Sequence, residues 1–156
     1  MNCFDFVECI GTPRDDEMRG DNIGNDVMQG MGGNDIMYGG DHDDKIRGSA
    51  GDDTITSKNG NDGVDGEEGN DKVDGGAGND GVSGSQGNDN IWGGDGNDYM
   101  WPGSGSDQVD AGWGDDIIYS FSDGSKDIID CGPGIDEVFS NTQDGDEVYS
   151  CEKVNQ

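Results

Sequence analysis

The stretch GGAGNDGVSGSQGND, residues 75–89, consists almost entirely of glycine and small polar residues, and its spacing decides the fold. Within it Asp80 and Asp89 stand nine residues apart, and each follows the pair Gly-Asn. Val82 and Ile91 each come two positions after one of these aspartates. Self-similarity at a fixed period is the sequence signature of a repeat protein, so the whole chain is best interpreted in units of nine residues.

The nine-residue period extends far beyond this stretch. An aliphatic residue or methionine lies two positions after every repeat aspartate, and glycine lies two positions before every one except Asp44, where His42 takes its place. The eleven aspartates in strict register are Asp26, Asp35, Asp44, Asp53, Asp62, Asp71, Asp80, Asp89, Asp98, Asp107 and Asp116. Degenerate copies are expected at Asp16/Met18, Asp127/Ile129 and Asp136/Val138.

The repeat closely resembles the nonapeptide of RTX (repeat-in-toxin) calcium-binding proteins, Gly-Gly-x-Gly-x-Asp-x-U-x, in which U is aliphatic. The clearest copies are GGAGNDGVS at 75–83 and GGDGNDYMW at 93–101, and residues 21–119, almost two-thirds of the chain, follow the pattern. The resemblance implies an all-β fold, a right-handed parallel β-roll with two nonapeptides per coil and calcium in the turns. The expected metal ligands are the eleven aspartates in register together with Asp127 and Asp136.

Stacked coils of this kind place like charges next to one another. Each nonapeptide is expected to form a turn of about six residues and a three-residue strand whose central side chain points inward. The aspartates then form two columns, and neighbouring carboxylates in a column repel each other by roughly 1–3.5 kcal/mol. The chain contains no leucine, and its small apolar content is typical of disordered proteins, so the interior alone does not hold the coils together.

A hard divalent cation between adjacent carboxylates would convert this repulsion into attraction. Turn carbonyls would complete the six to eight oxygen ligands that Ca²⁺ accepts, whereas Mg²⁺ is smaller and keeps its waters. The gaps between neighbouring aspartates number five on one edge and four on the other, which predicts about nine calcium ions. We expect the chain to be disordered without calcium and to fold as calcium binds.

The charge of the chain excludes several partners. The 156 residues carry 36 acidic and 8 basic side chains, for a formal net charge of −28, and the basic ones are scattered, which argues against nucleic acid and anionic membranes. No apolar run is long enough for membrane insertion. Calcium sites that saturate at millimolar concentrations favour an extracellular or cell-surface location.

The four cysteines lie near the two ends of the chain, at Cys3, Cys9, Cys131 and Cys151. This placement argues against a metal–thiolate cluster and favours disulfides, which agree with a secreted protein. Among the three connectivities we prefer Cys3–Cys9 with Cys131–Cys151. Intermolecular bonds and four reduced, buried thiols are the alternatives.

No catalytic motif is present, and no enzymatic activity or organic cofactor is expected. His42, the only histidine, has no evident base partner and is interpreted as a tolerated surface substitution for a turn glycine. The triplet Asp41-His42-Asp43 does not begin an EF-hand, because the sixth loop position is Ile46 instead of glycine and the twelfth is Asp52 instead of glutamate.

Outward-facing side chains suggest one interaction surface. Tyr99, Trp101, Ile117 and Tyr119 are expected to form a patch near the C-terminal end of the repeats. Either the C-terminal residues cover it, or another subunit or a sugar polymer contacts it. The expected organisation is an N-terminal cap or assembly segment at 1–20, the β-roll at 21–119, and degenerate last turns with a C-terminal cap at 120–156.

Three functions fit these features. The leading hypothesis is an extracellular, calcium-binding structural protein that assembles end to end into a fibre, filament or matrix. The first alternative is a carbohydrate-binding β-roll module of a secreted enzyme or adhesin, in which the patch together with Lys45 and Arg47 contacts a polysaccharide. The second, implied by the RTX resemblance, is a calcium-triggered folding module for type I secretion, from whose usual pattern the four cysteines and the tail CEKVNQ depart.

Overall fold

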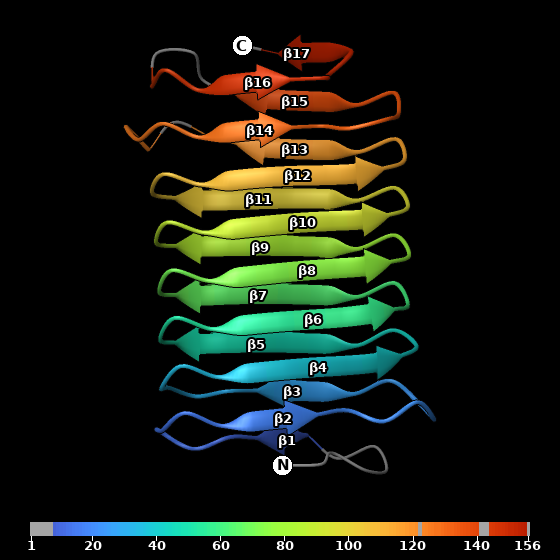
Figure 1. Ribbon diagram of the computed structural model, residues 1–156, viewed down its shortest axis with the longest axis vertical. Coiled ribbons are helices and arrows are strands. Elements are labelled where there is room, and N and C mark those ends of the chain that lie inside the picture. Colours follow the sequence, from blue (N-terminus) through green and yellow to red (C-terminus); the bar gives the residue numbers. More distant parts are fainter. Residues whose placement is uncertain (1–7, 122, 141–143, 156) are drawn as a thin grey trace.

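The computed structural model describes residues 8–121, 123–140 and 144–155. Across these ranges the chain forms a parallel β-solenoid of seventeen strands and contains no helix. Successive strands alternate between two sheets, so that the coils stack into a rod with β1 at one end and β17 at the other (Figure 1). Two nonapeptides form one coil, as predicted, because each strand pairs in parallel with the strand two places later in the chain.

One of the two sheets, here called the odd sheet, contains nine strands in the order β1-β3-β5-β7-β9-β11-β13-β15-β17. In the regular part of this sheet the register advances by 18 residues per coil, so Val64 pairs with Val82 and Val82 with Met100. Its strands are β1 (Cys9–Ile10), β3 (Val27–Gln29), β5 (Lys45–Ala50), β7 (Gly63–Glu68), β9 (Gly81–Gln86), β11 (Tyr99–Ser104), β13 (Ile117–Ser120), β15 (Glu137–Ser140) and β17 (Lys153–Asn155).

The second sheet, here called the even sheet, contains eight strands in the order β2-β4-β6-β8-β10-β12-β14-β16. The same register relates Val73, Ile91 and Val109 in successive coils. Its strands are β2 (Glu17–Arg19), β4 (Ile36–Asp41), β6 (Thr54–Asn59), β8 (Lys72–Ala77), β10 (Asn90–Asp95), β12 (Gln108–Trp113), β14 (Ile128–Asp130) and β16 (Glu147–Tyr149).

The strands of the central coils are longer than the three residues expected. Each strand from β4 to β12 has six residues, because the first three positions of the next nonapeptide continue it. In β9, Ser85 still pairs with Gly103, and the amide of Gly87 donates to the carbonyl oxygen of Ser104 at 2.9 Å. Stacking on an equivalent coil satisfies these backbone groups, so the turn proper shrinks to about three residues.

The interior is the column of aliphatic and methionine side chains that the repeat predicts. Every one of these side chains is at most 4% exposed. Cys9 takes the equivalent place in β1, where it pairs with Met28. The column comprises Met18, Met28, Met37, Ile46, Ile55, Val64, Val73, Val82, Ile91, Met100, Val109, Ile118, Ile129 and Val138.

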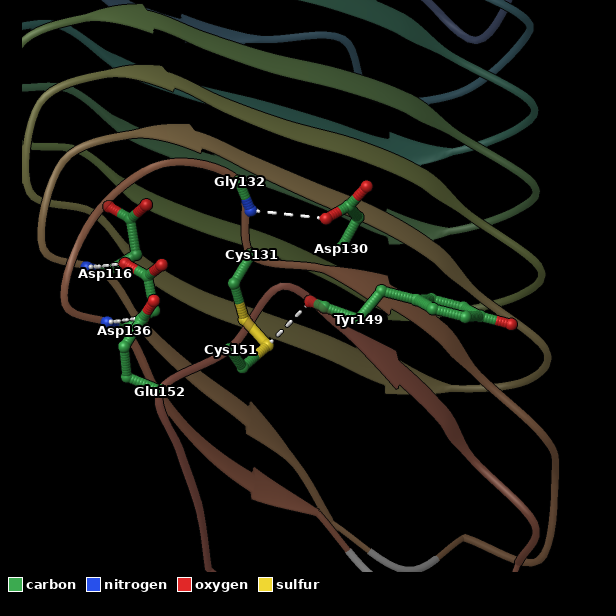
Figure 2. The surroundings of a disulfide bond; sticks show 8 residues. All are labelled: Asp116, Asp130, Cys131, Gly132, Asp136, Tyr149, Cys151 and Glu152. Atoms are coloured by element: carbon green, nitrogen blue, oxygen red, sulfur yellow. Dashed lines mark hydrogen bonds between the residues drawn. A yellow bond between two sulfur atoms is a disulfide. The ribbon is translucent and has the colours of Figure 1, made fainter.

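The described residues after position 120 continue the stack and do not fold back over it. Strands β14 and β16 extend the even sheet, and β15 and β17 extend the odd sheet. Cys131 and Cys151 form the expected disulfide, with their Cα atoms 5.2 Å apart, next to the column of acidic residues at this end (Figure 2). The pairing expected for Cys9 involves Cys3, which lies outside the described residues.

Candidate metal-binding edges

The repeated aspartates line the two edges of the solenoid, where the chain passes from one sheet to the other. From Asp35 onward, each stands immediately before a strand residue whose amide donates to a carbonyl oxygen of the previous coil. All thirteen predicted metal ligands are buried, and none is more than 4% exposed. Carboxylates are rarely buried unless they are paired, so their surroundings indicate their role.

One oxygen of each carboxylate connects two coils. The amide of Asp71 donates to Oδ1 of Asp89 at 2.8 Å, and the amide of Asp89 donates to Oδ1 of Asp107 at 2.8 Å. The same hydrogen bond, 2.7–3.1 Å long, recurs through every coil from Asp16 to Asp146 on one edge and from Asp26 to Glu152 on the other.

The second oxygen of most of these carboxylates has no hydrogen-bond partner in the described structure. Burying a carboxylate oxygen without a donor costs free energy, so each such atom calls for a positive partner. The eleven unpartnered atoms are Oδ2 of Asp35, Asp44, Asp53, Asp62, Asp71, Asp80, Asp89, Asp98, Asp107, Asp116 and Asp136.

A backbone carbonyl oxygen of the next coil lies close to the same space as the unpartnered atom at several first-turn glycines. A Cβ placed on Gly75 would lie 2.9 Å from Oδ2 of Asp80 and 2.6 Å from the carbonyl oxygen of Gly93, one coil further on. The first glycine of the repeat therefore keeps open a space in which carboxylate and carbonyl oxygens converge. Carboxylate and carbonyl oxygens that converge without a donor fit a hard cation such as Ca²⁺.

Side chains supply few of the oxygen atoms that line this space. Within residues 8–121, 123–140 and 144–155, no three His, Cys, Asp or Glu side chains come together in a cluster suited to a metal ion. A cation held at either edge would therefore take most of its ligands from the turn carbonyls. Glycine at the first turn position leaves this space free of a side chain in most coils, whereas Ser57, Pro102 and Ala111 occupy the same position in others.

Burial changes the pKa of the aspartates in both columns. It raises the pKa of the aspartates above the ordinary value, the hydrogen bond from the neighbouring amide partly opposes this, and nearby carboxylates raise the pKa further. Without a cation, burial therefore favours the protonated form of these groups. The pKa is raised to about 7 for Asp44, Asp71, Asp80, Asp107 and Asp116, and to about 6 for Asp53, Asp89 and Asp98.

At the N-terminal end of each column, a protein group donates to the second carboxylate oxygen, Oδ2. The amide of Asp21 donates to Oδ2 of Asp26 at 2.9 Å. On the other edge, the amide and hydroxyl of Thr12 donate to Oδ2 of Asp16 at 2.6 and 2.8 Å. Asp26, a predicted metal ligand, therefore differs from the aspartates in the middle of its column.

Near the C-terminal end of one column, a hydroxyl group donates to the second carboxylate oxygen. The side chain of Ser120, which stands where most repeats have their first glycine, donates to Oδ2 of Asp127 at 2.6 Å. The hydroxyl also lies 3.5 Å from Oδ2 of Asp146. Asp127, another predicted ligand, is thus already satisfied by the protein.

The fourth position of each turn from Gly33 to Gly114 has a left-handed backbone, which favours glycine there. Gly78 has a φ of 144°, and a Cβ there would overlap the carbonyl oxygen of Gly60 in the previous coil. His42 occupies the same position with a φ of 82° and is exposed. It is thus a non-glycine residue in a glycine conformation, in agreement with its interpretation as a surface substitution.

Sequence reasoning missed two features of these edges. The asparagine before the aspartate forms a second, exposed ladder, in which the amide of Asn79 donates to Oδ1 of Asn61 at 2.9 Å. The recurrent triplet Gly-Asn-Asp was its signal. In addition, Asp146 and Glu152 extend the two columns, at spacings of 19 and 16 residues that an 18-residue period conceals.

The predicted patch is a stack of aromatic rings on the odd sheet. Trp101 stacks on Tyr99 at 6.3 Å and on Tyr119 at 5.9 Å between ring centroids. Phe139 extends the stack beyond Tyr119 at 5.0 Å, and Phe121 contacts Tyr119 at 5.7 Å. Ile117 pairs with Tyr99 in the sheet. Tyr99 and Trp101 are 48% and 40% exposed, so the described residues leave this surface accessible.

The profile of the RTX calcium-binding nonapeptide repeat (4 copies) matches residues 10–41, 21–55, 47–82, 74–109 and 103–120, which together cover 10–120 without a gap. The chain belongs to the RTX calcium-binding repeat family. Its solenoid is the β-roll formed by these repeats, which are calcium-binding structural modules. A comparison with curated proteins gave no match.

RTX repeat proteins are typically secreted. In the part of this RTX chain that the structure describes, no helix has the length and apolar character needed to cross a membrane.

Proposed function

We propose that this RTX chain is a non-enzymatic, extracellular structural protein whose β-roll folds when Ca²⁺ binds along both edges. The unpartnered, buried Oδ2 atoms beside the turn carbonyls support this proposal above all. Calcium would supply the positive charge that the protein lacks at these points and would link successive coils. The proposed ligands are the column aspartates together with the carbonyl oxygens that converge on them.

The run of unpartnered oxygens supports a count of about nine ions. It contains five aspartates on one edge, from Asp35 to Asp107, and six on the other, from Asp44 to Asp136. The first run has four intervals between neighbouring aspartates and the second has five, so one ion in each interval gives nine ions. At Asp26 and Asp127 the protein already supplies a donor, and we therefore place the strongest sites in the middle of the rod.

A calcium titration followed by circular dichroism and native mass spectrometry tests this proposal. We expect a cooperative rise of the β signal and about nine bound ions, because the metal-free columns oppose stacking. Mg²⁺ at the same concentration is the control and should produce much less folding. An equal β signal in excess chelator and in millimolar calcium would contradict the proposal.

We further propose that the rods associate end to end with other copies of the chain. Among the described residues no strand pairs with the outer edge of β17, and an open parallel edge presents unpaired amides and carbonyls to a further strand. Light scattering and electron microscopy in calcium should then show filaments, whereas discrete monomers at all concentrations would contradict association.

A substitution in β17 makes this test specific. The amide of Lys153 already donates to the carbonyl oxygen of Asp136, and successive amides of a strand point to opposite sides, so that of Val154 points to the open edge. Val154→Pro should therefore shorten or abolish filaments while the β signal persists. Val154→Thr, which keeps the amide, is the matched control.

A second candidate function is polymer binding on the odd sheet. A cavity of about 320 Å³ lies between the basic pair Lys45 and Arg47 and the ring of Trp101, over coils where Gly63 and Gly81 have no side chain. Sugar rings stack on aromatic faces, and the basic groups would bind their hydroxyl or acidic substituents. Co-sedimentation with insoluble polysaccharides tests this. Trp101→Ala should abolish binding, and Trp113→Ala on the even sheet is its control.

A further inference from the structure

The outer face of the even sheet carries a cavity that the calcium-binding edges do not use. It has a volume of about 300 Å³ and lies over β10 and β12. We call it the tryptophan pocket; it is lined by Trp92, Gly94, Asp95, Asp110, Gly112 and Trp113, and by Pro133 of the following turn. The cavity is far smaller than a protein-docking surface and matches a single side chain or a small organic group.

The pairing register of β10 and β12 places two tryptophans and two aspartates around this pocket. Trp92 pairs with Asp110, and Asp95 pairs with Trp113, so each of two adjacent coils contributes one tryptophan and one aspartate in opposite order. Gly94 and Gly112 pair with each other between these residues. The floor therefore has no side chains, and a ligand can approach the backbone with an aromatic face and a carboxylate on either side.

The walls of this pocket have no partner within the described residues. Trp92 and Trp113 are 40% and 68% exposed, and neither contacts another aromatic ring or a cation, in contrast to Trp101 on the other sheet. Asp95 and Asp110 form no ion pair and accept no hydrogen bond through their side chains in the same ranges. Exposed large apolar faces of this kind mark interaction sites.

The chemistry of the walls selects a cation. The face of an indole ring carries negative electrostatic potential, and the two carboxylates carry full negative charge. Asp74 adjoins Trp92 and Asp130 adjoins Asp110 in the sheet, which adds further negative charge. Lys72, which pairs with Asn90, lies in an adjoining cavity of about 450 Å³ that Asp74, Trp92 and Gly94 also line. With a net charge of −28 the whole chain also attracts cations.

The shape of the site favours one kind of cation. A guanidinium group is planar, so it can stack on an indole ring while its forked N–H groups donate to a carboxylate. A lysine ammonium is more strongly hydrated and lacks this plane. Calcium would bind the carboxylates but would gain nothing from the two rings, because it takes oxygen ligands.

We propose that the tryptophan pocket binds the guanidinium group of an arginine side chain carried by a partner polypeptide. This inference goes beyond the proposed calcium-dependent function and needs only that the β-roll be folded. The indole rings hold the plane of the group, and Asp95 and Asp110 accept its N–H donors.

A fluorescence titration tests the proposal on calcium-saturated protein whose fold has been checked by circular dichroism. The Trp101→Phe variant leaves Trp92 and Trp113 as the only tryptophans. The probes are the peptide acetyl-Gly-Arg-Gly-amide and the same peptide with lysine or with neutral citrulline in place of arginine. We expect saturable quenching by the arginine peptide with a Kd on the order of 1 mM, weaker binding of the lysine peptide and none of the citrulline peptide.

Two variants distinguish this site from a non-specific attraction to an acidic protein. Trp113→Ala and Asp110→Asn should each weaken binding of the arginine peptide by about two- to five-fold or more. Asp65→Asn, which removes the same charge from the odd sheet, should leave Kd almost unchanged. The proposal is wrong if the citrulline peptide binds equally well, or if Asp65→Asn and Asp110→Asn have the same effect.

Discussion

The amide of Asp62 donates a hydrogen bond of 2.8 Å to Oδ1 of Asp80, which lies 18 residues later in the chain. The other oxygen of the same carboxylate, Oδ2 of Asp80, is buried and receives no hydrogen bond in the described structure. One side chain therefore joins two coils through one oxygen and offers the second to a cation. This double role can be tested by substituting a buried column aspartate and, as a comparison, its exposed neighbour.

Asp53→Asn should impair calcium-dependent folding far more than Asp52→Asn, although the two residues are adjacent and the charge change is identical. Oδ2 of Asp53 is buried and unpartnered, whereas Asp52 is exposed and accepts a hydrogen bond from the amide of Asn70, which an asparagine can also accept. We expect Asp53→Asn to raise the calcium concentration at half-folding by roughly ten-fold and to remove at least one bound ion. Equal midpoints for both variants, measured by circular dichroism, would contradict the assignment.

Gly78→Ala should prevent normal stacking, because a Cβ at a φ of 144° would overlap the carbonyl oxygen of Gly60. Gly63→Ala is its matched control. A Cβ on Gly63 would meet nothing closer than 4.0 Å, and its φ is not in the left-handed region. In thermal unfolding with saturating calcium, Gly78→Ala should lower Tm severely and Gly63→Ala should leave it nearly unchanged. Similar losses for both would show that glycine matters here for another reason.

Ser120→Gly should create an additional calcium site. The serine hydroxyl now donates to Oδ2 of Asp127, and its removal leaves that oxygen unpartnered beside a glycine, as in the central coils. Native mass spectrometry should then count one more calcium ion per chain. Ser104→Gly, at an exposed position, is the control and should not change the count. An unchanged count for Ser120→Gly would contradict the role given to this hydroxyl.

Acid should stabilise the metal-free coils. A carboxyl group whose pKa is higher in the folded state than in the unfolded state holds its proton more tightly when folded, so protonation favours folding. Burial raises the pKa of Asp71 and Asp107 from the ordinary 3.8 to about 7. In chelator, β structure should therefore increase as the pH falls from about 7 to about 4 and then level off.

Saturating calcium should reverse this pH dependence. Bound cations keep the carboxylates ionised, so protons compete with calcium, and acidification should raise the calcium concentration needed for folding. Circular dichroism over pH 4–8, with and without calcium, measures both trends. The same pH dependence in chelator and in calcium would contradict the coupling of these carboxylates to metal binding.

Much of this fold could be predicted because each coil repeats one short pattern. Met28 and Ile46 fall at the same repeat position, so their burial follows from spacing alone. The six-residue strands could not be predicted in the same way, since their outer halves depend on hydrogen bonds to a neighbouring coil. A single nonapeptide, considered alone, gives no sign that its glycine turn will pair as a strand.

The candidate site also has features that follow from the repeat period and features that do not. The aspartate columns follow directly from the period, whereas the Ser120–Asp127 hydrogen bond depends on where an insertion places a hydroxyl group. The tryptophan pocket was hidden for a different reason. Trp92 and Trp113 are 21 residues apart and occupy different repeat positions, so only the paired register of β10 and β12 brings them to one cavity.

The alternation of strands between the two sheets limits how the length of this chain can change during evolution. Loss of one nonapeptide, such as 75–83, would transfer every later strand to the opposite side of the rod and join an acidic column on one flank to its counterpart on the other. Loss of 75–92 would shorten the rod by one full coil and preserve both flanks downstream. Gene duplications and deletions within this repeat should therefore be retained mainly in even numbers of nonapeptides.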